Sequence, residues 1–110
     1  MADNRSLGRL GEGFAAELLE MDGYTIVERN FFCRAGEIDL ICEKEGEICF
    51  VEVKTRRSTN FGTPAEAICR EKIGRMRRAA LFYLQTRQWE QKEISFQVIE
   101  IVINQIPNAF

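Results

Sequence analysis

The run from Ile48 to Val53 constrains the fold of this chain more than any other feature, because it is apolar at every position except Glu52. A short apolar run of this kind is typical of a strand that is buried on both faces of a sheet. Two runs rich in Ile, Val, Phe and Tyr precede it, at Tyr24 to Phe31 and at Glu37 to Glu43. Turn formers separate the three runs, so we expect an antiparallel meander with Ile48 to Thr55 as its central strand.

Helical periodicity precedes these strands. From Arg5 to about Met21, apolar residues recur at spacings of three and four, which predicts an amphipathic helix ended by Gly23. The apolar stripe consists of Leu7, Leu10, Phe14 and Leu18. Gly8, Gly11 and Ala15 lie along one edge of the stripe. Small side chains at this edge would let the helix approach a sheet closely.

A second helix and a last strand follow. Thr63-Pro64-Ala65-Glu66 has the form of a helix start, with a threonine cap, proline at the first position and glutamate three residues after the cap. Alternatively, the helix begins near Arg70. Its apolar face would carry Ile73, Met76, Ala80 and Leu84. A strand from Ile94 to Val102 completes the order αβββαβ, an α/β (α+β) fold in one domain spanning residues 1–110.

Composition excludes several classes of protein. No apolar run approaches the ~20 residues of a membrane span, and the first twenty residues do not resemble a secretory signal, so we expect a cytoplasmic protein. The chain has no histidine, and its four cysteines lack Cys-x-x-Cys spacing, which argues against a zinc site. We expect these cysteines to be reduced, half-buried thiols. A net charge of −2 also argues against a protein that coats nucleic acid.

The local charge is different from the net charge. Between Lys54 and Arg78 the chain has eight basic residues against two acidic ones. A solvated helix face would explain such a run equally well. The run begins two residues after Glu52, which belongs to the candidate site described below. This position favours contacts with nucleic-acid phosphates instead. The residues predicted to make these contacts are Arg56, Arg57, Arg70, Lys72, Arg75 and Arg78.

The candidate site comes from the register of a hairpin. The short connection Lys44-Glu45-Gly46-Glu47 predicts a turn centred on Glu45-Gly46, which sets Asp39 opposite Glu52. Lys54 lies two residues beyond Glu52 and so points to the same face. Two carboxylates about 5 Å apart repel by roughly 3 kcal/mol at an effective dielectric constant near 20. A fold gains nothing from this repulsion unless a cation binds between the two acids.

We therefore expect Asp39, Glu52 and the Val53 carbonyl to bind Mg²⁺ or Mn²⁺, which prefer oxygen ligands. Lys54 would orient a water molecule or stabilise charge on a reacting phosphate. In a simpler alternative, the two acids pair with basic neighbours such as Lys54. Glu12, at the margin of the first helix's apolar stripe, is a third acid that could reach the site or remain solvated.

At these residues the sequence resembles the YraN family of uncharacterised bacterial proteins and, more distantly, the archaeal Holliday-junction resolvases of the PD-(D/E)xK nuclease superfamily. The most specific matching segments are Gly36-Glu37-Ile38-Asp39-Leu40-Ile41 and Phe50-Val51-Glu52-Val53-Lys54-Thr55-Arg56. Other matches include Gly11-Glu12, Arg29-Asn30, Phe61-Gly62-Thr63-Pro64 and Asn108-Ala109-Phe110. The sequence departs from the family pattern at Cys69, where an aspartate is usual, and at Phe32, where a basic residue is frequent.

The resemblance implies a restriction-endonuclease-like fold, a mixed sheet flanked by helices, with Glu12, Asp39, Glu52 and Lys54 at the catalytic positions. Three functions remain open at this point. The first is a Mg²⁺-dependent endonuclease acting on DNA, including structured or branched DNA. The second is a non-catalytic nucleic-acid-binding module, and the third is a protein-interaction domain. A homodimer would suit the cutting of both strands of a symmetric junction.

Overall fold

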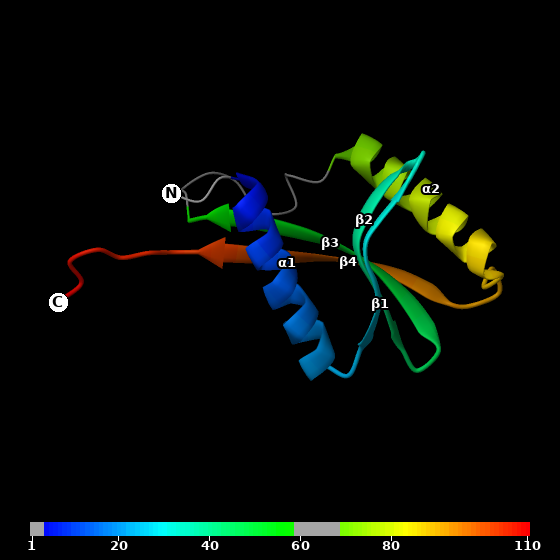
Figure 1. Ribbon diagram of the computed structural model, residues 1–110, viewed down its shortest axis with the longest axis horizontal. Coiled ribbons are helices and arrows are strands. Elements are labelled where there is room, and N and C mark those ends of the chain that lie inside the picture. Colours follow the sequence, from blue (N-terminus) through cyan, green and yellow to red (C-terminus); the bar gives the residue numbers. More distant parts are fainter. Residues whose placement is uncertain (1–3, 59–68) are drawn as a thin grey trace.

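The computed structural model describes residues 4–58 and 69–110, which form two helices and four strands. The elements are α1 (Asn4–Met21), β1 (Thr25–Cys33), β2 (Gly36–Lys44), β3 (Glu47–Arg57), α2 (Arg70–Arg87) and β4 (Ile94–Ile103). The sheet order is β1-β2-β3-β4 (Figure 1), antiparallel from β1 to β3 and parallel between β3 and β4. The predicted element order, the meander, the central position of β3 and a mixed sheet flanked by helices are therefore confirmed.

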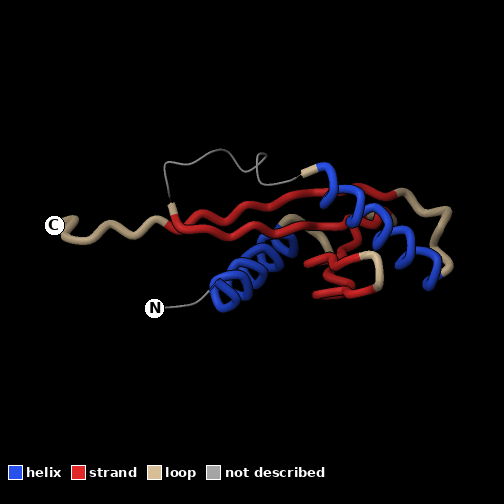
Figure 2. The backbone as a smooth tube through the Cα atoms, turned by 90° about the horizontal axis from the view of Figure 1, so that it is seen from above, coloured by secondary structure: helices blue, strands red, loops and turns tan. Residues whose placement is uncertain are grey.

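The alternation of side chains along β3 divides the core between the two faces of the sheet. Ile48 and Phe50 join a buried cluster with α2, whereas Cys49 and Val51 join a second cluster with α1. The two helices lie at different positions along the longest axis of the molecule (Figures 1 and 2). β3 thus contributes to both clusters, which explains why its sequence is apolar on both faces.

The packing of α1 differs from that of a simple amphipathic helix. Its buried residues are Gly11, Ala15, Ala16 and Leu19, while Leu10, Phe14 and Leu18 of the apolar stripe remain about half exposed. A Cβ atom at Gly11 would overlap the Thr55 side chain on β3. The small-residue edge of the helix therefore faces the sheet, as close approach requires, and the large residues lie beside it.

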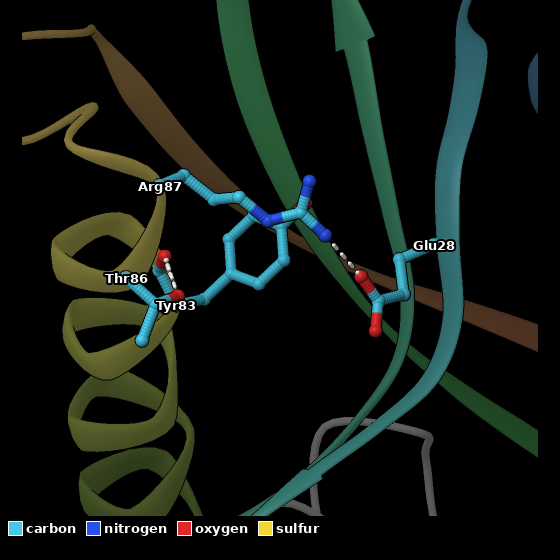
Figure 3. A network of polar contacts seen from close by, with 4 residues as sticks. All are labelled: Glu28, Tyr83, Thr86 and Arg87. Carbon is cyan, nitrogen blue, oxygen red and sulfur yellow. Dashed lines mark hydrogen bonds and ion pairs between the residues drawn. The ribbon is translucent and has the colours of Figure 1, made fainter.

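The second helix begins at Arg70, as one of the two alternatives predicted, and Thr63-Pro64-Ala65-Glu66 lies outside the described residues. Its buried residues are Met76, Ala79, Ala80, Tyr83 and Leu84. Ile73 was predicted to share this face but is more than a third exposed. At its other end (Figure 3), Arg87 Nη2 donates a 2.8 Å hydrogen bond to Glu28 Oε1 on β1 and lies over the Tyr83 ring. Thr86 donates a 2.8 Å hydrogen bond to the Tyr83 carbonyl.

The four cysteines are free thiols, as expected. Their burial is less uniform than predicted, because Cys33, Cys42 and Cys49 are buried in the core while Cys69 is exposed. Within the described residues, neither helix combines the length and the apolar character that a membrane crossing demands.

Candidate functional site

The β2–β3 hairpin has the register that the sequence predicts, because its paired residues have numbers that sum to 91 as far as Leu40 and Val51. The pairing ends there, one position short of Asp39 and Glu52. Beyond it, Asp39 Oδ2 accepts a 2.7 Å hydrogen bond from the Val53 N–H. The carboxylate thus occupies the place that a strand carbonyl holds elsewhere in the sheet. We call this end of the hairpin, with its two acids, the open end.

Glu52 is the one charged side chain that is buried among the described residues, with 4% of its surface exposed. Its Oε2 forms an ion pair with Lys72 Nζ of α2. This oxygen has no hydrogen-bond partner among the described residues. The attraction of the Lys72 ammonium group is therefore what offsets the cost of burying it. Removing a buried carboxylate from water costs several kcal/mol unless it is paired. Lys72 is therefore the counter-ion of Glu52 here rather than a solvated side chain.

The pKa of Asp39 is raised to about 7, chiefly by burial and next by a hydrogen bond with the Glu52 carboxyl group. The Val53 N–H lowers the pKa of Asp39, and the charges of Glu52 and Glu12 raise it. Two acids that share a hydrogen bond cannot both ionise without cost. The open end therefore holds negative charge that a cation would stabilise.

Glu12 approaches the open end from α1, where its side chain is partly buried. The pKa of Glu12 is raised by burial, then by the charge of Glu37 and more weakly by that of Glu52, whereas a hydrogen bond with Asn30 lowers it. The packing of Gly11 against β3 brings the neighbouring Glu12 to this position. α1 thus places a third carboxylate within electrostatic range of the acid pair.

Asn30 is a residue of this region that sequence reasoning did not select. Its neighbours in β1, Arg29 and Phe31, pair with Leu40 and Ile38, so Asn30 lies level with Asp39. Its φ of 52° is left-handed, a conformation that is rare for residues other than glycine and that asparagine tolerates best. Two features of the sequence pointed to Asn30: it is an asparagine in a strand-forming run, and Arg29-Asn30 is one of the segments that match the family pattern.

Lys54 has the position on β3 that alternation predicts, on the same face as Glu52, and its side chain is half buried. In the parallel pairing with β4 it lies level with Glu100. Glu100 accepts a 3.1 Å hydrogen bond from Arg56 Nε and forms an ion pair with it. Sequence reasoning missed Glu100, because nothing local indicates which residue of β4 would lie beside Lys54.

The other predicted nucleic-acid contacts are exposed. They are Arg57 at the end of β3 and Arg70, Arg75 and Arg78 on α2. Gly36, the first residue of β2 after the turn, lies close to Arg75, since a Cβ atom built at Gly36 would be 3.4 Å from the Arg75 Cβ. α2 therefore carries Lys72 at the open end and arginines beyond it, beside the β1–β2 turn.

The donors of the open end fit a hard divalent cation. The N–H and C=O of a strand residue point to the same side, so the Val53 carbonyl faces the gap that Asp39 enters. In residues 4–58 and 69–110, no three Asp, Glu, Cys or His side chains are grouped as metal ligands, so Glu12 does not form a ready ligand cluster with the two acids. Mg²⁺ commonly keeps several waters and takes one or two carboxylates. Asp39, Glu52 and the Val53 carbonyl would make such a set.

Comparison with known proteins identifies relatives along nearly the whole chain. The model of the uncharacterised protein family UPF0102 matches residues 11–101. A UPF0102 protein of Syntrophomonas wolfei is 52% identical over 97% of this chain and 99% of its own length. A UPF0102 protein of Dictyoglomus turgidum is 38% identical over 98% and 99% of the two chains, and one of Clostridium perfringens is 47% identical over 89% and 80%.

Proposed function

The chain belongs to the uncharacterised protein family UPF0102, the YraN family, and we propose that it is a metal-dependent endonuclease that hydrolyses DNA phosphodiesters. The observation that carries the proposal is the contact between buried Glu52 and Asp39, whose pKa is raised to about 7. Adjacent acids with a raised pKa destabilise a fold, and they occur most often where a site needs charge. The resemblance of the segments around Asp39 and Glu52 to PD-(D/E)xK nucleases supports the same conclusion.

Each residue of the open end has a distinct part in the proposed reaction. Mg²⁺ or Mn²⁺, when bound, supplies positive charge to a phosphoryl oxygen and acidifies a water molecule. Asp39, Glu52 and the Val53 carbonyl would hold the ion. Lys54 would stabilise the negative charge that develops on the phosphate during attack. Glu12 would accept a hydrogen bond from the attacking water and orient it.

The basic residues would supply affinity for DNA without reading its sequence. Exposed arginines such as Arg57, Arg70 and Arg75 would bind phosphates, so affinity should fall steeply with salt concentration. The resemblance to junction resolvases extends the proposal to structured or branched DNA, and this extension rests on analogy at the level of the fold.

A second function, non-catalytic binding of nucleic acid, is favoured by one specific observation. Lys72 already neutralises Glu52, and no third acidic ligand joins the pair among the described residues. A module of this kind would bind DNA equally well with and without divalent metal. Metal dependence therefore separates the two functions.

The test is a calorimetric titration of Mg²⁺ and Mn²⁺ into the wild type and the Asp39→Asn, Glu52→Gln double variant, followed by nicking assays on plasmid and four-way-junction DNA. We expect binding and cleavage in the wild type and neither in the variant. Glu17→Gln, Glu20→Gln is the matched control, because it removes the same charge from exposed positions on α1. A wild type that binds DNA but no metal, and cuts nothing, would establish the non-catalytic module.

A further inference from the structure

A groove between α2 and the β1–β2 turn lies outside the proposed active site. It has a volume of about 720 Å³. Its main lining side chains are Phe32, Arg34, Arg78, Leu81, Phe82 and Gln85. None of the acids of the open end lines it. We call it the Phe32–Phe82 groove.

The groove exposes aromatic surface that the core does not use. Phe32 is 77% exposed and Phe82 is 48% exposed. The Phe82 ring lies 6.4 Å from the Phe31 ring, which packs edge-on against buried Tyr83 at 5.1 Å. Phe82 is thus anchored to the core through Phe31 while about half of its surface stays open. Exposed aromatic residues grouped in one groove are typical of a binding surface.

The charge of the groove selects the chemistry of its ligand. Arg34 and Arg78 line it, and none of the described residues that line it is acidic. A symmetric dimer through this groove would set the arginines of one copy against those of the other, which is unfavourable. Single-stranded nucleic acid offers both phosphates for guanidinium groups and flat bases for aromatic rings.

The position of the groove connects it to the open end. Lys72, which contacts Glu52, and Phe82, which lines the groove, are carried by the same helix. At the rise of an α-helix they are separated by about 15 Å along its axis, roughly the length of four stacked nucleotides. Arg75 and Arg78 lie between them on the helix, and both are exposed. A strand at the open end could therefore continue along α2 into the groove.

We propose that the Phe32–Phe82 groove binds an unpaired nucleobase of the DNA strand, with the two phenylalanine rings against the base and Arg34 and Arg78 on the neighbouring phosphates. The inference rests on the proposed function and narrows its substrate class to DNA with an unpaired base roughly four nucleotides from the cleaved bond, as near branches and flaps.

The test measures binding to a single-stranded oligonucleotide that contains 2-aminopurine, to a flap duplex and to a fully paired duplex, all in EDTA. We expect Phe32→Ala, Phe82→Ala to weaken binding to the single strand and the flap by roughly 10-fold or more and to abolish quenching of 2-aminopurine. Binding to the paired duplex should change less than about 3-fold, because its bases are not available for stacking. Phe14→Ala, a half-exposed phenylalanine on α1, is the matched control.

A second variant shows whether the loss of binding comes from lost stacking or from a destabilised fold. Phe82→Leu keeps an apolar contact with Phe31 but removes the planar ring, so it should retain stability and lose quenching. Equal losses for all three DNAs, or none, would overturn the inference, as would a wild-type dimer that the alanine variant dissociates. The Phe variants should still bind Mg²⁺. Metal-dependent cleavage without quenching would therefore refute the groove alone, whereas quenching without metal binding would refute the proposed endonuclease alone.

Discussion

The two ends of the β2–β3 hairpin use the same strands in opposite ways. Near the turn, Ile48, Cys49 and Phe50 are fully buried and paired with β2. At the open end the pairing stops, and burial and the neighbouring Glu52 carboxyl group raise the pKa of Asp39 to about 7. The hairpin is thus stabilised at one end and holds an unfavourable charge pair at the other. This is the pattern expected where a site is built into a stable scaffold.

The largest expected loss of stability is at the end of the hairpin next to its turn, which we call the turn end. Phe50 has no exposed surface, and its ring lies 6.1 Å from that of Tyr83 and 5.5 Å from that of Phe96. Phe50→Ala should lower the free energy of unfolding by about 3–5 kcal/mol, because it removes buried apolar surface and leaves a cavity. Urea unfolding measures the change. Phe14→Ala, at a half-exposed position, should cost less than about 1 kcal/mol, and equal losses would contradict the comparison.

A smaller loss is expected when the open end loses its internal cation. Lys72→Met leaves Glu52 buried without a counter-ion and should lower the free energy of unfolding by about 2 kcal/mol, below the range for fully buried pairs because the Lys72 side chain is 33% exposed. Mg²⁺ should restore part of the loss if it binds beside Glu52. Urea unfolding with and without Mg²⁺ measures both effects. Arg77→Met, at an exposed position of the same helix, is the control, and an equal loss there would show that the ion pair contributes nothing.

For Asp39→Asn we expect a gain in the free energy of unfolding at neutral and alkaline pH rather than a loss. The pKa of Asp39 is about 7 in the folded protein against 3.8 for the free side chain, so the folded state binds more protons between these values and loses stability as pH rises from about 4 to 7. The asparagine side chain does not ionise and can still accept the Val53 hydrogen bond. The variant should be about 1–2 kcal/mol more stable than the wild type at pH 8, after allowance for partial solvent screening, and similar at pH 4.

Thermal unfolding of Asp39→Asn at pH 4 and pH 8, without metal, measures this difference. Mg²⁺ should raise the midpoint of the wild type at pH 8 and leave that of the variant unchanged. A variant that is destabilised equally at both pH values would show that Asp39 acts through packing rather than charge.

The turn end could be predicted from the sequence and the open end only in part. A four-residue connection fixes the register of a hairpin, so the pairing of β2 with β3, and with it the neighbourhood of Asp39 and Glu52, follows from counting residues. The left-handed backbone of Asn30 and the ion pair of Lys72 with Glu52 cannot be predicted by counting residues. They depend on how β1 bends and how α2 docks, which involve contacts distant in the sequence.

The packing of α1 shows the same limit. Hydrophobic periodicity located the helix but not its contact face, because Leu10, Phe14 and Leu18 remain half exposed and Ala15 and Ala16 are buried. Close approach of Gly11 to Thr55 decides the contact, and a hydrophobic pattern weighs large residues above small ones. Small residues along one edge of the stripe were the better signal of the buried face.

The smallest expected effect concerns the start of α2, which carries Lys72 to the open end. Cys69 is the N-cap, with an extended backbone (φ −91°, ψ 165°) and no side-chain hydrogen bond to the helix. Cys69→Asp should accept a hydrogen bond from the first turn and interact with the helix dipole, raising the free energy of unfolding by about 0.5–1 kcal/mol. Cys69→Ser separates the hydrogen bond from the charge, and Cys69→Ala should give no gain. Above about pH 5 an aspartate at the cap stays ionised, so from there to pH 8 the pH dependence of stability that Asp39 causes should keep its shape in all three variants. A changed profile in this range would mean that the helix start and the acid pair are coupled.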